Sequence, residues 1–161
     1  MFLSKEPAER PVMDLFSCMK RNVIHISPES SMRDAADTFI RYHIGTLPVV
    51  DTNGKLVGIL SIRDLVSQVF PDFVNMMQDI DFILDFGAAE TRKPDNEMLM
   101  TPVRSIMHSP VSGKGDCSLL RASALIKKHN LLDLPVVDDE ERLIGIASLV
   151  DIGTKFLQSW N

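Results

Sequence analysis

The apolar and polar positions of this chain follow an order of elements that occurs twice. In the first half, residues 47–50 form a short apolar run rich in β-branched side chains, and a second apolar run spans residues 56–60. The turn between them, at residues 51–54, contains Asn and Gly, which tolerate a positive φ. This pattern predicts a β-hairpin.

The hairpin lies in a repeated segment. Residues 47–65 read LPVVDTNGKLVGILSIRDL and residues 134–152 read LPVVDDEERLIGIASLVDI, so that 10 of the 19 aligned positions are identical. Similarity of this kind indicates two copies of one supersecondary unit. The second turn, at residues 138–141, has no glycine, and we therefore expect that hairpin to use a longer or different turn.

A helix is expected before each hairpin, because apolar residues recur there at the spacing of one helical face. They are Met32, Ala35, Ala36, Phe39 and Ile40 in the first half, and Leu119, Ala122 and Ile126 in the second. Gly45 either ends the first helix or shapes the turn into the strand. Asn130 is expected to end the second helix in a left-handed conformation.

A further helix is expected after each hairpin. Ser61 and Ser148 are each followed three residues later by an aspartate, which is the spacing of a capping box at a helix N-terminus. A short strand at residues 23–26 precedes the first helix, and Val111 holds the matching place in the second half. Each half therefore reads strand, helix, strand, strand, helix, and we expect an α/β (α+β) fold made of two similar units.

The two units are separated by a linker. Within it, residues 73–84 place Phe, Met, Ile and Leu at helical spacing, as in a helix that packs in a core or against another subunit, and residues 88–97 are polar. We expect a helix followed by a flexible connection. The predicted segments are an N-terminal arm (1–11), the first unit (12–70), the linker (71–101) and the second unit (102–161).

Composition restricts the class of protein. Of the 161 residues, 45% are hydrophobic and 24% are charged, as in globular proteins with a buried core. The formal net charge of −5, without a basic stripe, argues against nucleic-acid binding. No apolar run reaches the length of a membrane span, and the N-terminus becomes charged too early for a secretory signal. We therefore expect a cytoplasmic protein that binds neither nucleic acid nor a membrane.

The sequence offers little for catalysis. His25, His43, His108 and His129 are scattered, and the chain contains no H-E-x-x-H, C-x-x-C or nucleophile-elbow pattern. The two cysteines have no paired metal-ligand spacing. We therefore expect no enzymatic activity, no metal site and no required cofactor.

The repeated block, an hPVVD strand followed by an hhGhhS-x-x-D segment, resembles the cystathionine-β-synthase (CBS) domain. Two copies in one chain resemble the tandem CBS pair often called a Bateman module, over about residues 12–70 and 102–158. The resemblance implies two β-α-β-β-α units packed about a pseudo-two-fold axis. It also implies a regulatory binder of AMP, ADP, ATP or S-adenosylmethionine in the clefts between the units, commonly a disc-like homodimer that signals to a partner protein.

The resemblance further implies roles for individual residues. The aspartates of the S-x-x-D motifs, Asp64 and Asp151, would accept hydrogen bonds from a ribose. The positions implied for phosphate are Ser61, Ser148, Arg63 and His43. The positions implied for an adenine pocket are Ile24, Ile26, Thr46, Pro48, Val111, Asp133 and Pro135.

Two interpretations of the motifs stay open. Each serine and aspartate pair suffices as a helix cap, worth about 1 kcal/mol, and the repeats would then form a dimerisation or protein-interaction scaffold without a nucleotide. The copies are not equivalent in charge, because Arg63 in the first motif is replaced by Val150 in the second. We therefore expect the two clefts to differ in affinity, or one of them to be empty.

Overall fold

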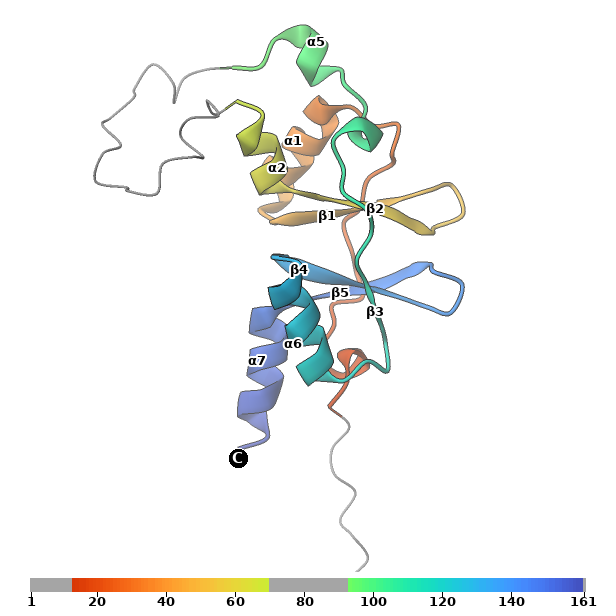
Figure 1. Ribbon diagram of the computed structural model, residues 1–161, viewed down its shortest axis with the longest axis vertical. Coiled ribbons are helices and arrows are strands. Elements are labelled where there is room, and N and C mark those ends of the chain that lie inside the picture. Colours follow the sequence, from red (N-terminus) through yellow and green to blue (C-terminus); the bar gives the residue numbers. More distant parts are fainter. Residues whose placement is uncertain (1–12, 70–92, 161) are drawn as a thin grey trace, which may run out of the picture.

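Two β-hairpins, one from each half of the chain, form the centre of the molecule in a computed structural model that describes residues 13–69 and 93–160. Figure 1 shows them as two stacked layers. Each hairpin is antiparallel, and β3 adds to β4 in parallel. The strands are β1 (Thr46–Val50), β2 (Leu56–Ser61), β3 (Gly113–Lys114), β4 (Asp133–Val137) and β5 (Leu143–Ser148).

Backbone hydrogen bonds join the two hairpins at their turns. The Leu56 N–H donates to the Glu141 carbonyl, and the Leu143 N–H donates to the Gly54 carbonyl, both at 3.0 Å. Hydrogen bonds between main-chain groups depend little on the side chains present. The turns therefore fix the two layers relative to each other even though the turn sequences differ.

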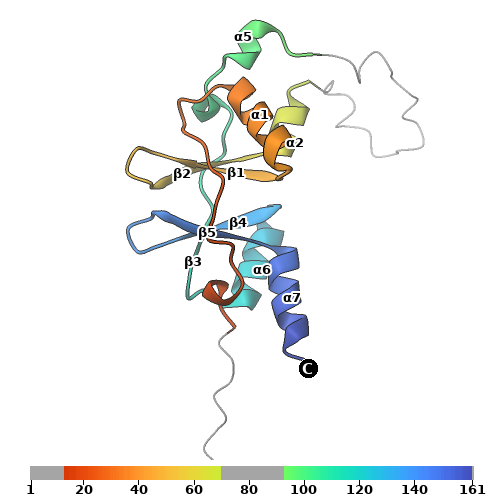
Figure 2. The ribbon, with the colours of Figure 1, turned by 180° about the vertical axis from the view of Figure 1, so that it is seen from behind.

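Helices cover the outer face of each hairpin, as Figure 2 shows from behind. They are α1 (Met32–Tyr42) and α2 (Ile62–Ser67) on the first unit, and α6 (Leu119–Lys128) and α7 (Leu149–Gln158) on the second. The predicted capping boxes of Ser61 and Ser148 begin α2 and α7, and a third, from Ser31, begins α1. Asn130 has the expected left-handed φ, 52°, whereas α1 ends at His43, with φ 50°, rather than at Gly45.

Among the described residues the core consists of two clusters, and each is completed by a segment from the other half of the chain. Leu15 and Met19 come first in the sequence but pack with Leu134 in the core of the second unit. Val103 begins the second half but packs with Leu47 in the first unit. Figures 1 and 2 show both segments crossing between the layers. They carry the 3-10 helices η1 (Leu15–Ser17) and η3 (Val103–Ser105).

Two glycines of the repeat allow these exchanged segments to approach. A Cβ on Gly58 would overlap the side chain of Met107, and a Cβ on Gly145 would overlap the side chain of Met19. The neighbouring backbone carbonyl would lie only 3.2 Å from the added atom at each site. The two glycines are therefore required by packing between the units, not by the conformation of their strands.

The expectation of a longer or different second turn was wrong. The two turns have the same hydrogen bonds, because Asp51 and Asp138 each accept from two backbone N–H groups of their own turn through Oδ1. Glu141 adopts the left-handed conformation, with φ 63°, that Gly54 adopts with φ 78°. The aspartate side chain thus defines the turn, and glycine is not needed to form it.

Three other expectations need correction. The strand at residues 23–26 is reduced to a single parallel bridge between Ile26 and Val49. Ile40 is 70% exposed and does not join the buried face of α1. The polar stretch at residues 88–97 is not only a connection, since α5 (Asn96–Leu99) begins near its end, capped by Asp95. The apolar stripe at residues 73–84 lies outside the described residues.

The glycine contacts predict a stability difference. Gly58→Ala should destabilise the protein by about 1–3 kcal/mol, because the added methyl group overpacks the contact with Met107. Met107→Ala should reduce that penalty in the double variant, since the overlapping side chain is removed. Denaturant titration of the four proteins in this cycle measures both effects.

Gly153→Ala is the matched control. Gly153 lies within α7, and, apart from its chain neighbours and its own helix backbone, no atom of the described residues lies within 4 Å of the position of an added Cβ. Alanine should therefore stabilise this helix by about 0.5–1 kcal/mol. Equal effects of alanine at positions 58 and 153 would contradict the packing argument.

Candidate functional site

A cavity of about 750 Å³ lies between the two units. Its lining comes from β2 and the start of α2, from the crossing segment that contains His108 and Val111, and from the residues between α6 and β4. Asp64, Asn130 and Asp133 face it. The cavity therefore combines side chains from both repeats and exists only when the units are packed together.

Asp64 performs two tasks at this cavity. Its Oδ2 accepts hydrogen bonds from the Ser61 N–H and the Ser61 hydroxyl, at 2.6 and 2.7 Å, and so completes the capping box of α2. Its Oδ1 lies 2.9 Å from His108 Nε2. The Asp64 side chain is 20% exposed and that of His108 71% exposed. The carboxylate is therefore fixed, whereas its histidine partner is accessible to solvent.

Asp151 has the same arrangement in the second unit. Its Oδ2 accepts from the Ser148 N–H at 2.9 Å and from the Ser148 hydroxyl at 2.7 Å, and its Oδ1 lies 3.3 Å from Lys20 Nζ. Burial alone would raise the pKa of Asp151, but the hydrogen bonds from Ser148 and the charge of Lys20 outweigh it, and the pKa lies below its ordinary value.

A second cavity, of about 250 Å³, is also lined by residues of both units. Lys20, Ile24 and His43 line it, but Asp151 does not. Thr46 and Asp133, which begin β1 and β4, line both cavities. The two cavities are therefore neighbours, and they differ in size and in the access that they give to the motif carboxylate.

Thr46 carries an unpaired polar atom at this shared wall. The residue is 4% exposed, and its Oγ1 has no hydrogen-bond partner within the described residues. A buried hydroxyl without a partner costs free energy that a polar ligand atom can recover. Arg63, which also lines the larger cavity, donates to the Asn130 carbonyl and so connects α2 to the end of α6.

The structure brings only some of the sequence-predicted residues to the cavities. Those that line the larger cavity are Thr46, Ser61, Arg63, Asp64, Val111 and Asp133. Those that line the smaller one are Ile24, His43, Thr46 and Asp133. Those that line neither are Ile26, Pro48, Pro135, Ser148 and Asp151.

Sequence reasoning missed three charged or titratable residues at the cavities, namely Lys20, His108 and His129. A signal for two of them exists, because Met19-Lys20 and Met107-His108 occupy matching places once the one-residue slip between the halves is allowed. The local pattern does not show that Lys20 contacts Asp151 or that His108 contacts Asp64, since the partners lie far apart in the sequence.

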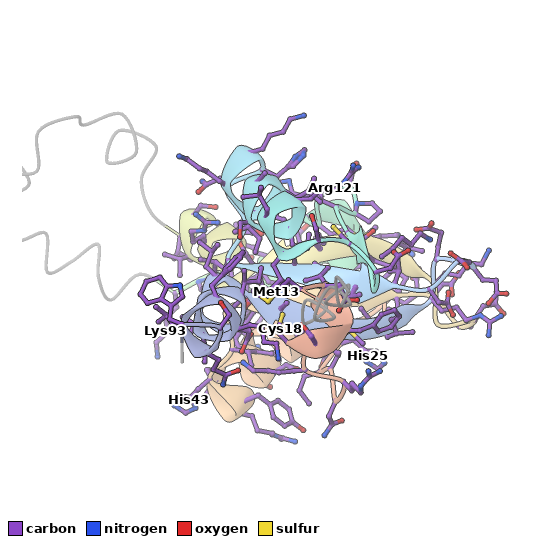
Figure 3. The ribbon with its side chains drawn as sticks, turned by 90° about the horizontal axis from the view of Figure 1, so that it is seen from below. Met13, Cys18, His25, His43, Lys93 and Arg121 are labelled. Carbon is purple, nitrogen blue, oxygen red and sulfur yellow. The ribbon has the colours of Figure 1, made fainter. Side chains whose placement is uncertain are left out.

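The remaining titratable groups form no further centre in the part of the chain that the structure describes. No group of three metal-ligating side chains occurs there, and Figure 3 shows His25 and His43 well apart. Cys18 and Cys117 are free and partly buried against the core of the second unit. Burial raises the pKa of both thiols, which makes them poor nucleophiles.

Comparison with known proteins identifies the family. A family model described as the CBS domain matches the chain twice, at residues 12–70 and 103–154. The chain belongs to the CBS domain family. The predicted tandem CBS pair is thereby confirmed, together with its mixed α and β fold.

Relatives of similar length and much longer ones both match this CBS pair. The uncharacterized protein MJ1426 of Methanocaldococcus jannaschii is 29% identical, over 93% of this chain and 95% of that protein. The CBS domain-containing protein YhcV of Bacillus subtilis is 30% identical, over 83% of this chain and 79% of that protein. Inosine-5'-monophosphate dehydrogenase of M. jannaschii is 33% identical over 82% of this chain, but the match spans only 21% of the enzyme. The activity of that enzyme is therefore not implied by the match.

Solved structures share the fold. CBSX2, a CBS-pair protein from Arabidopsis thaliana solved in complex with AMP, has a TM-score of 0.69 at 24% identity, over 92% of this chain and 98% of that one. The CBS domain pair of protein MJ0100, solved with 5'-methylthioadenosine and S-adenosylmethionine, has a TM-score of 0.68 at 23% identity, over 92% and 99%. The cytosolic domain of the Mg²⁺ channel MgtE, solved with ATP, has a TM-score of 0.63 at 22% identity, over 88% and 48%.

The structure also bears on membrane insertion. Among the helices of residues 13–69 and 93–160, none has the length and apolar character needed to cross a bilayer.

The depressed pKa of Asp151 predicts a pH-dependent stability. Because the pKa is lower in the folded protein than in the unfolded chain, the carboxylate stabilises the fold above the unfolded pKa, and this contribution disappears as the pH falls through the folded value. Asp151→Asn should therefore be less stable than the wild type near neutral pH, and the difference should shrink below about pH 4. Urea denaturation between pH 7 and 3 measures it, and two parallel profiles would show that the carboxylate charge contributes nothing.

Proposed function

We propose that this CBS pair binds an adenine nucleotide, AMP, ADP or ATP, in the larger cavity and acts as a regulatory module rather than as an enzyme. The observation that carries the proposal is the position of Asp64, a fixed carboxylate at the wall of a cavity of about 750 Å³ that Arg63, His108 and His129 also line. Sites for small molecules typically measure about 300–1,000 Å³. The smaller cavity, at about 250 Å³, falls below that range.

The lining fits the three parts of a nucleotide. A carboxylate offers about four lone-pair positions, of which Ser61 and His108 use three in Asp64, so about one remains for a ribose hydroxyl. Arg63 can balance the charge of a phosphate, and His129 can donate a hydrogen bond to it. An apolar base can lie against the hydrophobic part of the lining, which consists of Ile59, Val111, Leu131 and Leu132.

Support for an adenosine ligand comes from the structural neighbours. CBSX2 was solved with AMP, the MgtE domain with ATP, and the MJ0100 domain pair with S-adenosylmethionine and 5'-methylthioadenosine. These molecules share an adenosine group and differ at the 5' position. We therefore expect the adenosine group to be recognised in the cavity, with S-adenosylmethionine as the alternative to a nucleotide. The cytoplasmic location and the regulated protein partner stay predictions.

A scaffold without a nucleotide is the second candidate, and one observation favours it. Asp34 completes a capping box with Ser31 in the same way that Asp64 does with Ser61, and Asp34 lines neither cavity. A capping box therefore needs no ligand to explain it. Asp34 also supplies the control that separates the two candidates.

Asp64→Asn should weaken AMP binding by about tenfold to a hundredfold, because a charge-assisted hydrogen bond to the ribose is lost. Asp34→Asn should leave binding unchanged, although both variants lose cap energy of up to about 1 kcal/mol. Isothermal titration calorimetry of the wild type and both variants with AMP, ADP, ATP and S-adenosylmethionine tests this. If no ligand distinguishes Asp64→Asn from Asp34→Asn, the scaffold becomes the better interpretation.

We also propose that the protein self-associates as a homodimer through α2 and α7. Ile62, Val66, Leu149 and Leu157 on these helices are between 41% and 53% exposed. Figures 1 and 2 both place α2 and α7 on the same side of the molecule. Several exposed apolar side chains on one side of a molecule favour an interaction surface there. The stripe of Met77 and Ile80, which the sequence also suggests for association, lies outside the described residues.

The double variant Val66→Asp, Leu157→Asp should convert the dimer to a monomer, because carboxylates would be buried without partners at the interface. Light scattering during gel filtration gives the mass of each protein. Met100→Asp is the control, since Met100 is 65% exposed and follows α5 rather than lying on α2 or α7. A monomeric wild type, or a double variant of unchanged mass, would exclude this surface.

A further inference from the structure

The carboxylates of the two S-x-x-D motifs are held by different residues in equivalent places. Lys20 exchanges backbone hydrogen bonds with Ile146, at 2.9 and 3.0 Å, and His108 does the same with Ile59. Ile59 and Ile146 are aligned positions of the repeat. The pseudo-two-fold arrangement therefore presents a lysine to one carboxylate and a histidine to the other.

Lys20 and His108 differ in the cavity that they line and in whether the carboxylate that they contact lines that cavity too. His108 lines the larger cavity together with the carboxylate that it contacts, that of Asp64. Lys20 lines the smaller cavity, whereas Asp151, which it contacts at 3.3 Å, does not. Lys20 thus contacts the carboxylate and also lines the smaller cavity, whereas the carboxylate itself does not reach that cavity.

The chemistry of the two side chains increases this difference. A ribose diol that donates both hydroxyls needs two acceptor positions, and the capping box together with one further partner leaves only about one of the carboxylate's four. The partner must therefore move when the diol binds. A lysine ammonium can turn any of its three N–H donors toward a carboxylate, whereas one imidazole nitrogen presents at most one, so the lysine is the stronger competitor for the carboxylate.

We propose that the side chain at this position determines which cleft accepts a ribose. Lys20 keeps the cleft at Asp151 closed to the ligand, and His108 leaves the cleft at Asp64 open, so that each chain binds one ligand. This inference rests on the proposed nucleotide binding and adds to it the residues that select the site.

The test uses adenosine, which carries the ribose and the base but no phosphate to interact with a lysine. Calorimetric titration should give one adenosine per wild-type chain and two for Lys20→Ala, in which Asp151 faces its cavity. His108→Lys should weaken adenosine binding at the first cleft by about fivefold or more, because a permanent charge then competes for Asp64. Lys127→Ala is the control, since Lys127 lies on α6 and lines neither cavity.

AMP provides a readout that a merely structural role would not change. In His108→Lys the new ammonium can contact the phosphate of AMP, and AMP should therefore lose less affinity than adenosine. A general distortion of the cleft would weaken both ligands alike. If Lys20→Ala does not fold, Lys20→His makes the same test, because it copies the partner found in the first cleft.

The outcomes separate this inference from the proposed function. The selection by Lys20 and His108 is overturned if Lys20→Ala keeps one site and His108→Lys has an unchanged affinity for adenosine. Nucleotide binding stays intact in that case, provided that the wild type binds AMP at one site. Two sites in the wild type also overturn the selection. A folded wild type that binds neither adenosine nor AMP overturns both.

Discussion

The exchange of two short segments between the units is the constraint on which the rest of the structure depends. Met19 completes the core of the second unit and Met107 packs against that of the first. Each needs a glycine opposite it, because any side chain there would occupy the same space. Lys20, which follows Met19, pairs with the β5 backbone and contacts Asp151. His108, which follows Met107, pairs with the β2 backbone and contacts Asp64. The packing that builds each core therefore also builds the polar side of each cleft.

This arrangement lets one carboxylate act in folding and in recognition. The capping bonds of Asp64 and Asp151 use Oδ2, and the partner from the crossing segment uses Oδ1. A ligand that replaces the partner leaves the cap intact, so the helix need not lose stability when the cleft is filled. At the cleft that binds the ligand, the reorganisation is confined to His108, whose side chain is 71% exposed and can leave the carboxylate of Asp64 at small cost.

Local sequence patterns were sufficient for the hairpins, the helix starts and the two-unit organisation, because each depends on residues close together in the chain. The capping boxes at Ser61 and Ser148 and the left-handed Asn130 are examples. The pairing of His108 with Asp64 joins residues 44 positions apart, and no periodicity encodes such a contact. The prediction for the second turn was wrong for another reason. The Asp138 side chain accepts the hydrogen bonds of the turn, and Glu141 adopts the positive φ that was expected to require a glycine.

The two clefts differ because their side chains differ at equivalent positions, whereas the backbones of the two units are nearly symmetric. Both hairpins have the same register, and both motif aspartates make the same cap. Arg63 reaches across to the end of α6 and faces the larger cavity, whereas its counterpart Val150 is 75% exposed. At the larger cavity Arg63 supplies a positive charge that the equivalent position of the second unit lacks, and this charge favours an anionic ligand there. Because the two units share one backbone arrangement, such side-chain differences can change the ligand preference of one cleft without altering the fold. A repeated unit can therefore keep both motif carboxylates and use them differently.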